Sequence, residues 1–322
     1  MKKLVIDHTN ENQRIDKYLK KLLVKAPASM IYKMLRKKDV KVNGVKVKEN
    51  YIVKYGDVVE LFLYDDKFQE YTAPMTIHDL AITFKTAYED EHLLVANKPA
   101  GLLVQPDTKD DFDTLSYQVL SYLSQKGDYD PALAQGFTPG PVHRLDRNTS
   151  GLVMLGKDMR ALQDLNEMMK KRHCVDKKYL TIVKGYMKDC ELIDYVKKNE
   201  AEGKMYLVKE NTPGALKMHT LVHVIKARPQ YSLVEVSLIT GRTHQIRVHL
   251  ASTGHPVMGD AKYGDFEWNK AIKKKYHLNS QLLHAYSLNF VRPIGSMKYM
   301  QGKTITAPLP PLFKKIKKDL FD

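Results

Sequence analysis

The residues best suited to chemistry lie in the stretch 140–156, which reads GPVHRLDRNTSGLVMLG. One carboxylate, Asp146, stands between two arginines, Arg144 and Arg147. Nearby cations favour the ionised form of a carboxylate and orient it. Such a carboxylate suits a nucleophile or a base that acts on an anionic polymer. The alternative interpretation is a solvated surface loop, because charged residues mostly lie on the outside of proteins.

This stretch contains a longer motif, HRLDRNTSG, and three further segments support it. HRLDRNTSG resembles the H-R-L-D-x-x-T-S-G motif of the RluA family of pseudouridine synthases. The other matching segments follow the family's order: YEDEHLLVANKPAGLLVQ at 88–105, KKYLTIVKG at 177–185 and LITGRTHQIRVHLASTGHPVMGDAKYG at 238–264. One departure is Gln105, which stands where the family often has histidine. With the N-terminal module described below, the resemblance covers nearly the whole chain.

The resemblance implies that the protein isomerises uridine to pseudouridine in RNA. The bond from uracil N1 to the ribose breaks, the base turns, and its carbon 5 joins the same sugar carbon. No redox step or net group transfer occurs, so the reaction implies no cofactor. Breaking a glycosidic bond calls for a carboxylate near the anomeric carbon, and Asp146 is the candidate. Attack on the base, attack on the sugar and removal of the 2′ proton all remain open.

The family's motifs also suggest roles for other residues. Arg242, after Thr-Gly, is expected to be the buried ion-pair partner of Asp146, and Tyr179 to lie on or near the target base. A uridine inside folded RNA must be turned out of its stack, which costs a few kcal/mol. Arg144 and Arg147 are expected to hold the flanking phosphates. We expect three residues to support the active-site loop: His143, Thr149 and Gly151.

The first 65 residues form a distinct basic unit, with 15 Lys and Arg against 8 Asp and Glu, a net charge of +7. Apolar residues at helical spacing predict two amphipathic helices. Asn43-Gly44 then predicts a hairpin, because this pair adopts the positive φ angles of a tight turn. The unit resembles a small RNA-binding module found in a ribosomal small-subunit protein and in many RNA-modifying enzymes. Its expected RNA-binding residues are Lys33, Arg36, Lys37 and Lys41, although a solvated basic surface would look the same.

Composition narrows the class of protein. The chain has 322 residues and a net charge of +15, which is typical of proteins with a polyanionic partner. The chain has two cysteines, too few for a disulfide framework, and no CxxC pair suggests a structural zinc. His244 and His249 are five apart, which is poor spacing for two metal ligands on a helix. We therefore expect a cytoplasmic monomer without metal, signal peptide or membrane segment.

The predicted fold class is α+β, with a small N-terminal α/β RNA-binding module and a larger catalytic domain on a mainly antiparallel sheet, the pseudouridine synthase fold. We predict the module at 1–65, a linker at 66–80 and the catalytic domain at 81–322. Short β-prone runs alternate with helical patterns at 114–125 and 158–172 in this larger domain.

The function implied is an RNA pseudouridine synthase, and the module indicates the members that act on large-subunit ribosomal RNA. One alternative is a non-catalytic RNA-binding or ribosome-assembly protein that keeps the fold. A second alternative is a hydrolytic nucleosidase, which would release free uracil. A protein kinase is excluded because Leu145 interrupts the HRD motif and no glycine-rich loop precedes it.

Overall fold

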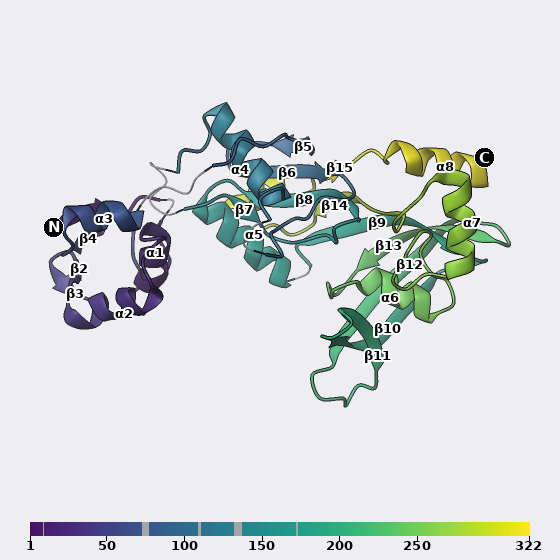
Figure 1. The fold of residues 1–322 in the computed structure, drawn as a ribbon, viewed down its shortest axis with the longest axis horizontal. Helices are drawn as coiled ribbons and strands as arrows, with labels where there is room; N and C mark the ends of the chain where they lie inside the picture. The colour runs from purple at the N-terminus through teal and green to yellow at the C-terminus, as the bar shows by residue number, and fades with distance from the viewer. Residues whose placement is uncertain (9, 73–76, 109–110, 132–136, 172) are drawn as a thin grey trace.

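The computed structural model describes residues 1–8, 10–72, 77–108, 111–131, 137–171 and 173–322. A small N-terminal unit lies to one side of a larger unit (Figure 1). Its elements are β1 (Lys2–Val5), α1 (Ile15–Leu22), α2 (Ala28–Lys37), β2 (Val40–Val42), β3 (Val45–Lys46), β4 (Val58–Leu61) and α3 (Asp65–Thr72). The four strands form one antiparallel sheet in the order β1-β4-β2-β3.

The N-terminal unit folds as its apolar pattern predicts. Helix α1 buries one face, including Tyr18 and Leu19, against a separate apolar cluster. Asn43 and Gly44 both have positive φ angles, of 53° and 77°, and they join β2 to β3. The predicted hairpin is therefore confirmed, and its turn has the backbone signs of type I′.

The predicted linker at 66–80 differs from the structure over its first half. Residues 66–72 belong to helix α3, whose Phe68 and Tyr71 pack against the N-terminal apolar cluster. The backbone N–H of Lys25 also donates to the carbonyl of Tyr71 at 3.2 Å. Helix α3 is therefore part of the N-terminal unit, because its aromatic side chains complete that core. Residues 73–76 of the predicted linker lie outside the described residues.

The larger unit is built on one mixed, mainly antiparallel sheet. In the described residues the strand order is β11-β10-β12-β13-β9-β14-β8-β6-β5, and β14 and β8 form its parallel pair. The strands are β5 (Lys85–Glu89), β6 (Leu93–Lys98), β7 (Gly140–Pro141), β8 (Ser150–Gly156), β9 (Val175–Lys184), β10 (Cys190–Asn199), β11 (Lys204–Val208), β12 (Leu216–Ala227), β13 (Tyr231–Leu238), β14 (Leu283–Phe290) and β15 (Thr304–Thr306).

Both faces of the sheet are covered near β6. Along β6, Leu94 and Ala96 join the cluster that contains α4 (Leu115–Lys126). Leu93 and Val95 join the opposite cluster, which contains α5 (Met159–Lys171). Successive side chains of a strand point to opposite faces, so the two helices cover opposite faces of the sheet.

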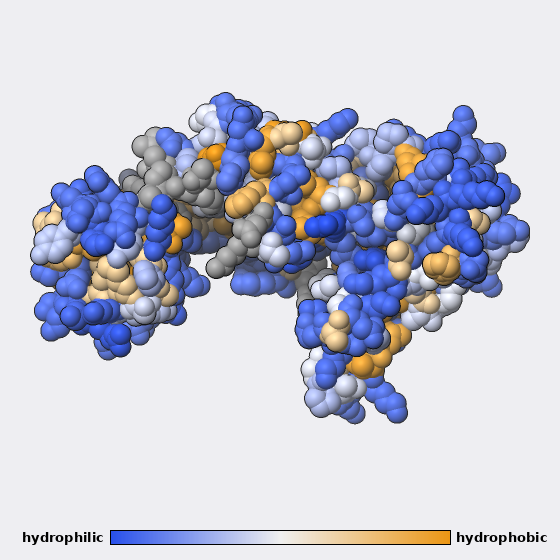
Figure 2. Space-filling view, viewed as in Figure 1, coloured by the Kyte–Doolittle hydropathy of each residue, from blue (hydrophilic) through white to orange (hydrophobic). Residues whose placement is uncertain are grey.

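Four more helical segments complete the larger unit: α6 (Gln245–Ser252), α7 (Phe266–Tyr276), the 3₁₀ helix η1 (Gly295–Met300) and α8 (Pro311–Phe321). Helices α7 and α8 pack in a separate apolar cluster that also includes Ile182 of β9 and Leu233 of β13. Figure 2 shows hydrophilic residues over most of the visible surface, on the N-terminal unit and over α7 and α8 alike. Every helix within the described ranges is too short or too polar to cross a bilayer.

Candidate active site

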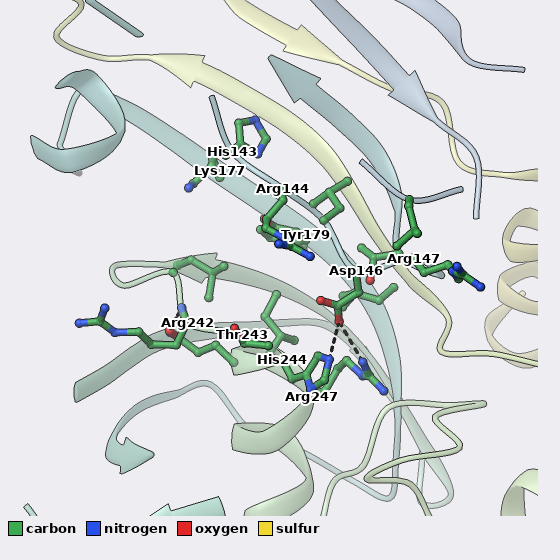
Figure 3. A pocket seen from close by; sticks show the side chains of 18 of the residues that line it. His143, Arg144, Asp146, Arg147, Lys177, Tyr179, Arg242, Thr243, His244 and Arg247 are labelled. Atoms are coloured by element: carbon green, nitrogen blue, oxygen red, sulfur yellow. Dashed lines mark hydrogen bonds and ion pairs between the residues drawn. The ribbon is translucent and has the colours of Figure 1, made fainter. Parts of the chain in front are cut away.

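A pocket of about 660 Å³ contains all three residues that the sequence suggests for chemistry, Asp146, Tyr179 and Arg242. Figure 3 shows Asp146 and Tyr179 close together in this pocket, with Arg242 to one side. Asp146 belongs to the loop between β7 and β8, Tyr179 to β9, and Arg242 to the segment before α6. The fold thus brings together residues that lie about a hundred positions apart in the chain.

The Asp146 loop is fixed by its own turn and by a close approach of two strands. The N–H of Thr149 donates to the carbonyl of Asp146 at 3.0 Å, and the buried Thr149 hydroxyl accepts from Gln281 at 3.4 Å. Gly151 has a φ of 115°, and a Cβ there would lie 2.1 Å from the carbonyl oxygen of Ala285. Only glycine lets β8 approach β14 this closely at the end of the loop.

Lys98, which lies in the matched segment 88–105, also holds the Asp146 loop in place. Its side chain is fully buried at the end of β6. The ammonium donates to the carbonyls of Arg147, Leu102 and Pro99 at 2.9, 2.7 and 2.9 Å. Burial lowers the pKa of Lys98 to about 7, and the nearby Asp146 carboxylate opposes that change. Three carbonyl acceptors match the three donors of an ammonium group, so the charged form fits this site.

The ion-pair partner of Asp146 is Arg247, and the prediction of Arg242 in this role is wrong. Arg247 donates from Nη1 to Asp146 Oδ2 at 2.9 Å and from Nε and Nη2 to Asp260 at 2.7 and 2.8 Å. Arg242 instead donates from Nε to the carbonyl of Lys217 at 3.1 Å, and its side chain extends away from Asp146 (Figure 3). The physical reason is that Arg242 precedes α6, whereas Arg247 lies within that helix and points to the loop.

The motif itself does not distinguish Arg247 from Arg242, and the burial of α6 explains why Arg247 pairs with a carboxylate. The segment QIRVHLAS of α6 is almost entirely buried, and arginine is rarely buried without an anionic partner. Burial alone would lower the pKa of Arg247, but hydrogen bonds and charge from Asp260 and charge from Asp146 raise it. Hydrogen bonds from Arg247 and from the backbone N–H groups of Lys262 and Tyr263 lower the pKa of Asp260 against its burial. The guanidinium is therefore a permanent cation between two carboxylates.

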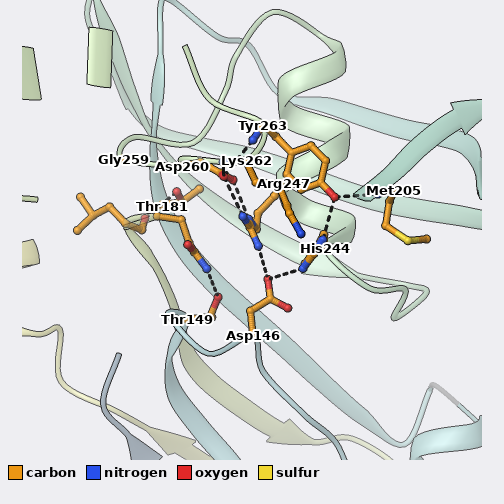
Figure 4. Close-up of polar contacts among 12 residues, drawn as sticks. Asp146, Thr149, Thr181, Met205, His244, Arg247, Gly259, Asp260, Lys262 and Tyr263 are labelled. Atoms are coloured by element: carbon orange, nitrogen blue, oxygen red, sulfur yellow. Dashed lines mark hydrogen bonds and ion pairs between the residues drawn. The ribbon is translucent and has the colours of Figure 1, made fainter. Parts of the chain in front are cut away.

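His244 forms the other side of this network. It stands at the N-terminus of α6 in a left-handed conformation, with φ of 55°. Its Nε2 lies 4.0 Å from Asp146 Oδ2, and its Nδ1 lies 2.8 Å from the Tyr263 hydroxyl, as Figure 4 shows. The Tyr263 oxygen accepts from the N–H of Met205 at 2.9 Å, which favours donation of its own hydrogen to Nδ1. Of the influences on the pKa of His244, burial is the largest, and it lowers the pKa. The ring is therefore neutral, and its proton is on Nε2, which faces Asp146.

Tyr179 and His143 line the same pocket from the sheet side. Tyr179 is buried, and burial first and the Asp146 charge second raise its pKa, so its hydroxyl keeps its proton. Nε2 of His143 accepts the N–H of Met154 at 3.1 Å. Burial, and to a lesser degree Lys177, lower the pKa of His143 to about 3. A neutral His143 that is bonded to β8 is consistent with the predicted support of the loop.

The expected RNA-binding residues occupy two separate places. Arg144 and Arg147 are exposed beside Asp146, and Arg144 lies 3.9 Å from the carboxylate of Asp107. On the N-terminal unit three cations are exposed on one side of α2: Lys33, Arg36 and Lys37. Lys41 lies on β2 with its ammonium 5.0 Å from the ring centre of Phe62. No group of three or more potential metal ligands occurs among the residues that the structure describes.

The chain is similar to known proteins over almost its whole length. The sequence profile of a family described as RNA pseudouridylate synthase matches residues 92–252, and that of the S4 domain matches residues 13–59. A protein of Vibrio vulnificus (strain CMCP6) named ribosomal large subunit pseudouridine synthase C is 35% identical, covering 98% of this chain and 95% of that protein. A protein of the same name from Buchnera aphidicola subsp. Baizongia pistaciae (strain Bp) is 32% identical over 98% and 96%.

A solved structure shares the fold. Human RNA Pseudouridylate Synthase Domain Containing 4 superposes with a TM-score of 0.57 at 24% identity, and the alignment covers 73% of this chain and 92% of that one. At this identity the similarity concerns the architecture of the large sheet and its helices.

Proposed function

The chain belongs to the RNA pseudouridylate synthase family, and from this membership we propose that it isomerises uridines of large-subunit ribosomal RNA with Asp146 as the reacting carboxylate. The chain is an RNA pseudouridine synthase and carries an N-terminal S4 domain. The proposal adds the substrate RNA and the residues that act on it.

One observation supports Asp146 more than any other. Its carboxylate is held by Arg247 at 2.9 Å at the edge of a pocket, yet its side chain remains 26% exposed. The other carboxylate that Arg247 holds, Asp260, has a fully inaccessible side chain. Asp146 therefore keeps one oxygen available to a ligand while Arg247 fixes the other.

The pocket walls suit an extruded uridine. Apolar side chains of Leu103, Leu238 and Leu283 line it together with the ring of Tyr179, and flat bases bind well between apolar and aromatic groups. Arg144 and Arg147 stand at the rim, where the phosphates of the same strand would lie. Filling the pocket would also exclude water, which would otherwise trap the sugar.

The chemistry balances without any added group. The N1–C1′ bond breaks, the base turns, the C5–C1′ bond forms, and the hydrogen on C5 leaves to solvent while N1 gains one. Asp146 could stabilise the sugar or the base during this exchange, and Arg247 keeps the carboxylate ionised and in one orientation. We infer that the protonated hydroxyl of Tyr179 forms a hydrogen bond with the base as the base rotates.

The ribosomal substrate is inferred from relatives and charge. Curated relatives that cover almost the whole chain are named ribosomal large subunit pseudouridine synthase C. The net charge of +15 favours a large polyanion, and the exposed cations of α2 supply a second contact to it. We also propose a cytoplasmic location, by analogy with these relatives, which are named for their action on ribosomal RNA.

Release of tritium from RNA labelled at uracil carbon 5 tests the proposal directly. The wild type should release the label from large-subunit ribosomal RNA, and Asp146→Asn should bind the same RNA without releasing it. Free uracil on chromatography would indicate a nucleosidase instead, and binding without release by the wild type would indicate a non-catalytic protein. Mapping pseudouridine in RNA from a strain that lacks the protein would identify the target uridine.

A further inference from the structure

A second cavity, of about 430 Å³, meets the first at Asp146. The two cavities share Asp146, Arg147, His244 and Arg247. From there the second cavity continues in another direction, past the start of β11 and the segment that precedes β14. Its remaining walls are Asn148, Lys204, Ala261, Lys262, Asn279, Ser280 and Gln281.

Apart from the four shared residues, the two cavities are lined by different side chains. The first has several apolar walls, including Leu238 and Leu283. The second adds two lysines, Lys204 and Lys262, together with side-chain amides and a hydroxyl. A base needs flat apolar surfaces, whereas a phosphate and a ribose need cations and hydrogen-bond donors. The second cavity is thus suited to the backbone of a nucleic acid.

Three cations of this cavity have no ion-pair partner among the described residues. Among the described residues, Arg147, Lys204 and Lys262 have no carboxylate within 4.0 Å, in contrast with Arg247, which holds two. Lys262 donates to the carbonyl of Gly203 at 2.7 Å, and an ammonium with one such contact keeps two further donors. Three uncompensated cations around one concave space favour an anion there.

Hydrogen bonds fix the wall that carries Lys204 and Lys262. The backbone N–H groups of Lys262 and Tyr263 donate to Asp260 Oδ1 at 2.8 and 3.1 Å. Tyr263 in turn accepts from the N–H of Met205 at 2.9 Å, so the start of β11 is tied to this loop (Figure 4). The carboxylate that holds Arg247 therefore also positions both lysine-bearing segments.

We propose that the second cavity binds the phosphate and ribose of the nucleotide next to the target uridine, with Arg147, Lys204 and Lys262 as its phosphate ligands. This inference rests on the proposed function and adds a subsite to it. Because the cavities meet at Asp146, one strand can place its extruded uracil in the first and its adjoining backbone in the second.

The double variant Lys204→Gln/Lys262→Gln tests the subsite in the full-length protein. We expect KM for tritium-labelled large-subunit ribosomal RNA to rise about tenfold or more, with kcat at saturating RNA within about threefold of the wild type. The slope of log Kd against log salt should fall by about 0.7 for each lost contact. The variant Lys204→Arg/Lys262→Arg keeps both charges and should retain most of the affinity.

A matched control removes two exposed lysines that line neither cavity, Lys85→Gln on β5 and Lys298→Gln on η1. An equal loss of affinity in this control, or an unchanged salt slope in the double variant, would overturn the subsite. Binding slopes are measured in the Asp146→Asn background, so they report on the subsite even if turnover fails. Lys204→Gln alone repeats the test should the double variant not fold, and circular dichroism checks folding.

Discussion

Arg247 Nη1 lies 2.9 Å from Asp146 Oδ2 while the same guanidinium holds Asp260 through its other two nitrogens. The arginine side chain is 8% exposed, Asp260 is fully buried and Asp146 is 26% exposed. The pair therefore links a buried structural carboxylate to an accessible one. Such an arrangement fixes the accessible carboxylate without closing it to a ligand.

We expect Arg247→Met to remove activity and to destabilise the fold. Without the guanidinium, Asp260 becomes an unpaired buried charge, which costs about 3–5 kcal/mol of unfolding free energy. Asp146 also loses its orientation, and a displacement of about 1 Å can cost about 100-fold in rate. Urea unfolding and tritium release measure the two effects.

The double variant Arg247→Met/Asp260→Asn separates these effects. It removes the buried charge as well, so part of the stability should return while kcat stays low. A double variant with near-normal turnover would show that Arg247 matters only for folding.

We expect Arg242→Gln to behave differently from Arg247→Met. Arg242 contacts the carbonyl of Lys217 and not Asp146, so kcat at saturating RNA should stay within about threefold of the wild type. As a cation at the pocket wall it should contribute to RNA affinity, with a loss of about three- to tenfold. Single-turnover tritium release separates rate from affinity, and a 100-fold loss of rate would return Arg242 to the central role.

The sequence predicted the elements of this fold well wherever local pattern decides structure. The amphipathic helix α1, the Asn43-Gly44 hairpin and the main strands all depend on spacing that can be read along the chain. The helical pattern predicted at 158–172 corresponds to α5, where Asp158 accepts the N–H of Ala161 at 2.8 Å. Helix α3 was missed because its packing on the N-terminal core depends on contacts between distant residues, such as Lys25 and Tyr71.

The sequence predicted the loop that carries Asp146, but not the residue that pairs with it. Asp146 and Tyr179 share a pocket as expected. However, Arg242 and Arg247 lie five positions apart in one motif, and the sequence does not show which of them pairs with Asp146. Which one reaches it depends on where α6 begins and on the angle at which it crosses the sheet. Lys98 lies in the matched segment 88–105, but its role could not be predicted, because its three acceptors are backbone carbonyls, which carry no signal in the sequence.

Replacing Lys98 with methionine should lower activity through the position of the loop. The change keeps the side-chain length but leaves the carbonyls of Arg147 and Leu102 without their donor, at a cost of about 1–3 kcal/mol each. We expect kcat to fall about 100-fold because Asp146 precedes Arg147 directly.

Lys157→Met is the matched control for Lys98. Lys157 is 9% exposed and pairs with Glu89 and Asp128 at 2.9 and 2.8 Å, but it lines neither cavity. It should lose stability and keep its kcat. A comparable loss of kcat in both variants would mean that instability alone explains the effect of Lys98→Met.

Acid should destabilise the protein partly through His284. Burial lowers the pKa of His284 to about 4, against opposing hydrogen bonds with Ala307 and Ser150, from an ordinary value near ~6.5. Between these values the unfolded chain binds a proton that the folded chain does not. The contribution of His284 is therefore complete above pH 6.5 and is lost as the pH falls toward 4.

Urea unfolding at pH 7 and 4.5 measures this loss. In His284→Asn the fall in stability between the two should be smaller by about 2 kcal/mol. His277→Asn, at the exposed end of α7, is the control and should match the wild type. An equal fall in all three proteins would contradict a role for His284.

The exposed cations of α2 should contribute affinity without contributing to chemistry. Lys33, Arg36 and Lys37 point away from the buried residues of α2, and they belong to a unit separate from the one that carries Asp146 (Figure 1). Changing all three to glutamine should lower the salt slope of binding to large-subunit ribosomal RNA by about 2 to 3, because each phosphate contact contributes about 0.7–0.9. The rate at saturating RNA should not change.

The control Lys2→Gln/Lys3→Gln/Lys67→Gln removes equal charge from lysines that already pair with Asp65, Glu60 and Glu70. Equal salt slopes for the two triple variants would show that the α2 cations act only through the net charge of the protein. If α2 contacts phosphates directly, its variant must lower the slope more than the control of equal charge does.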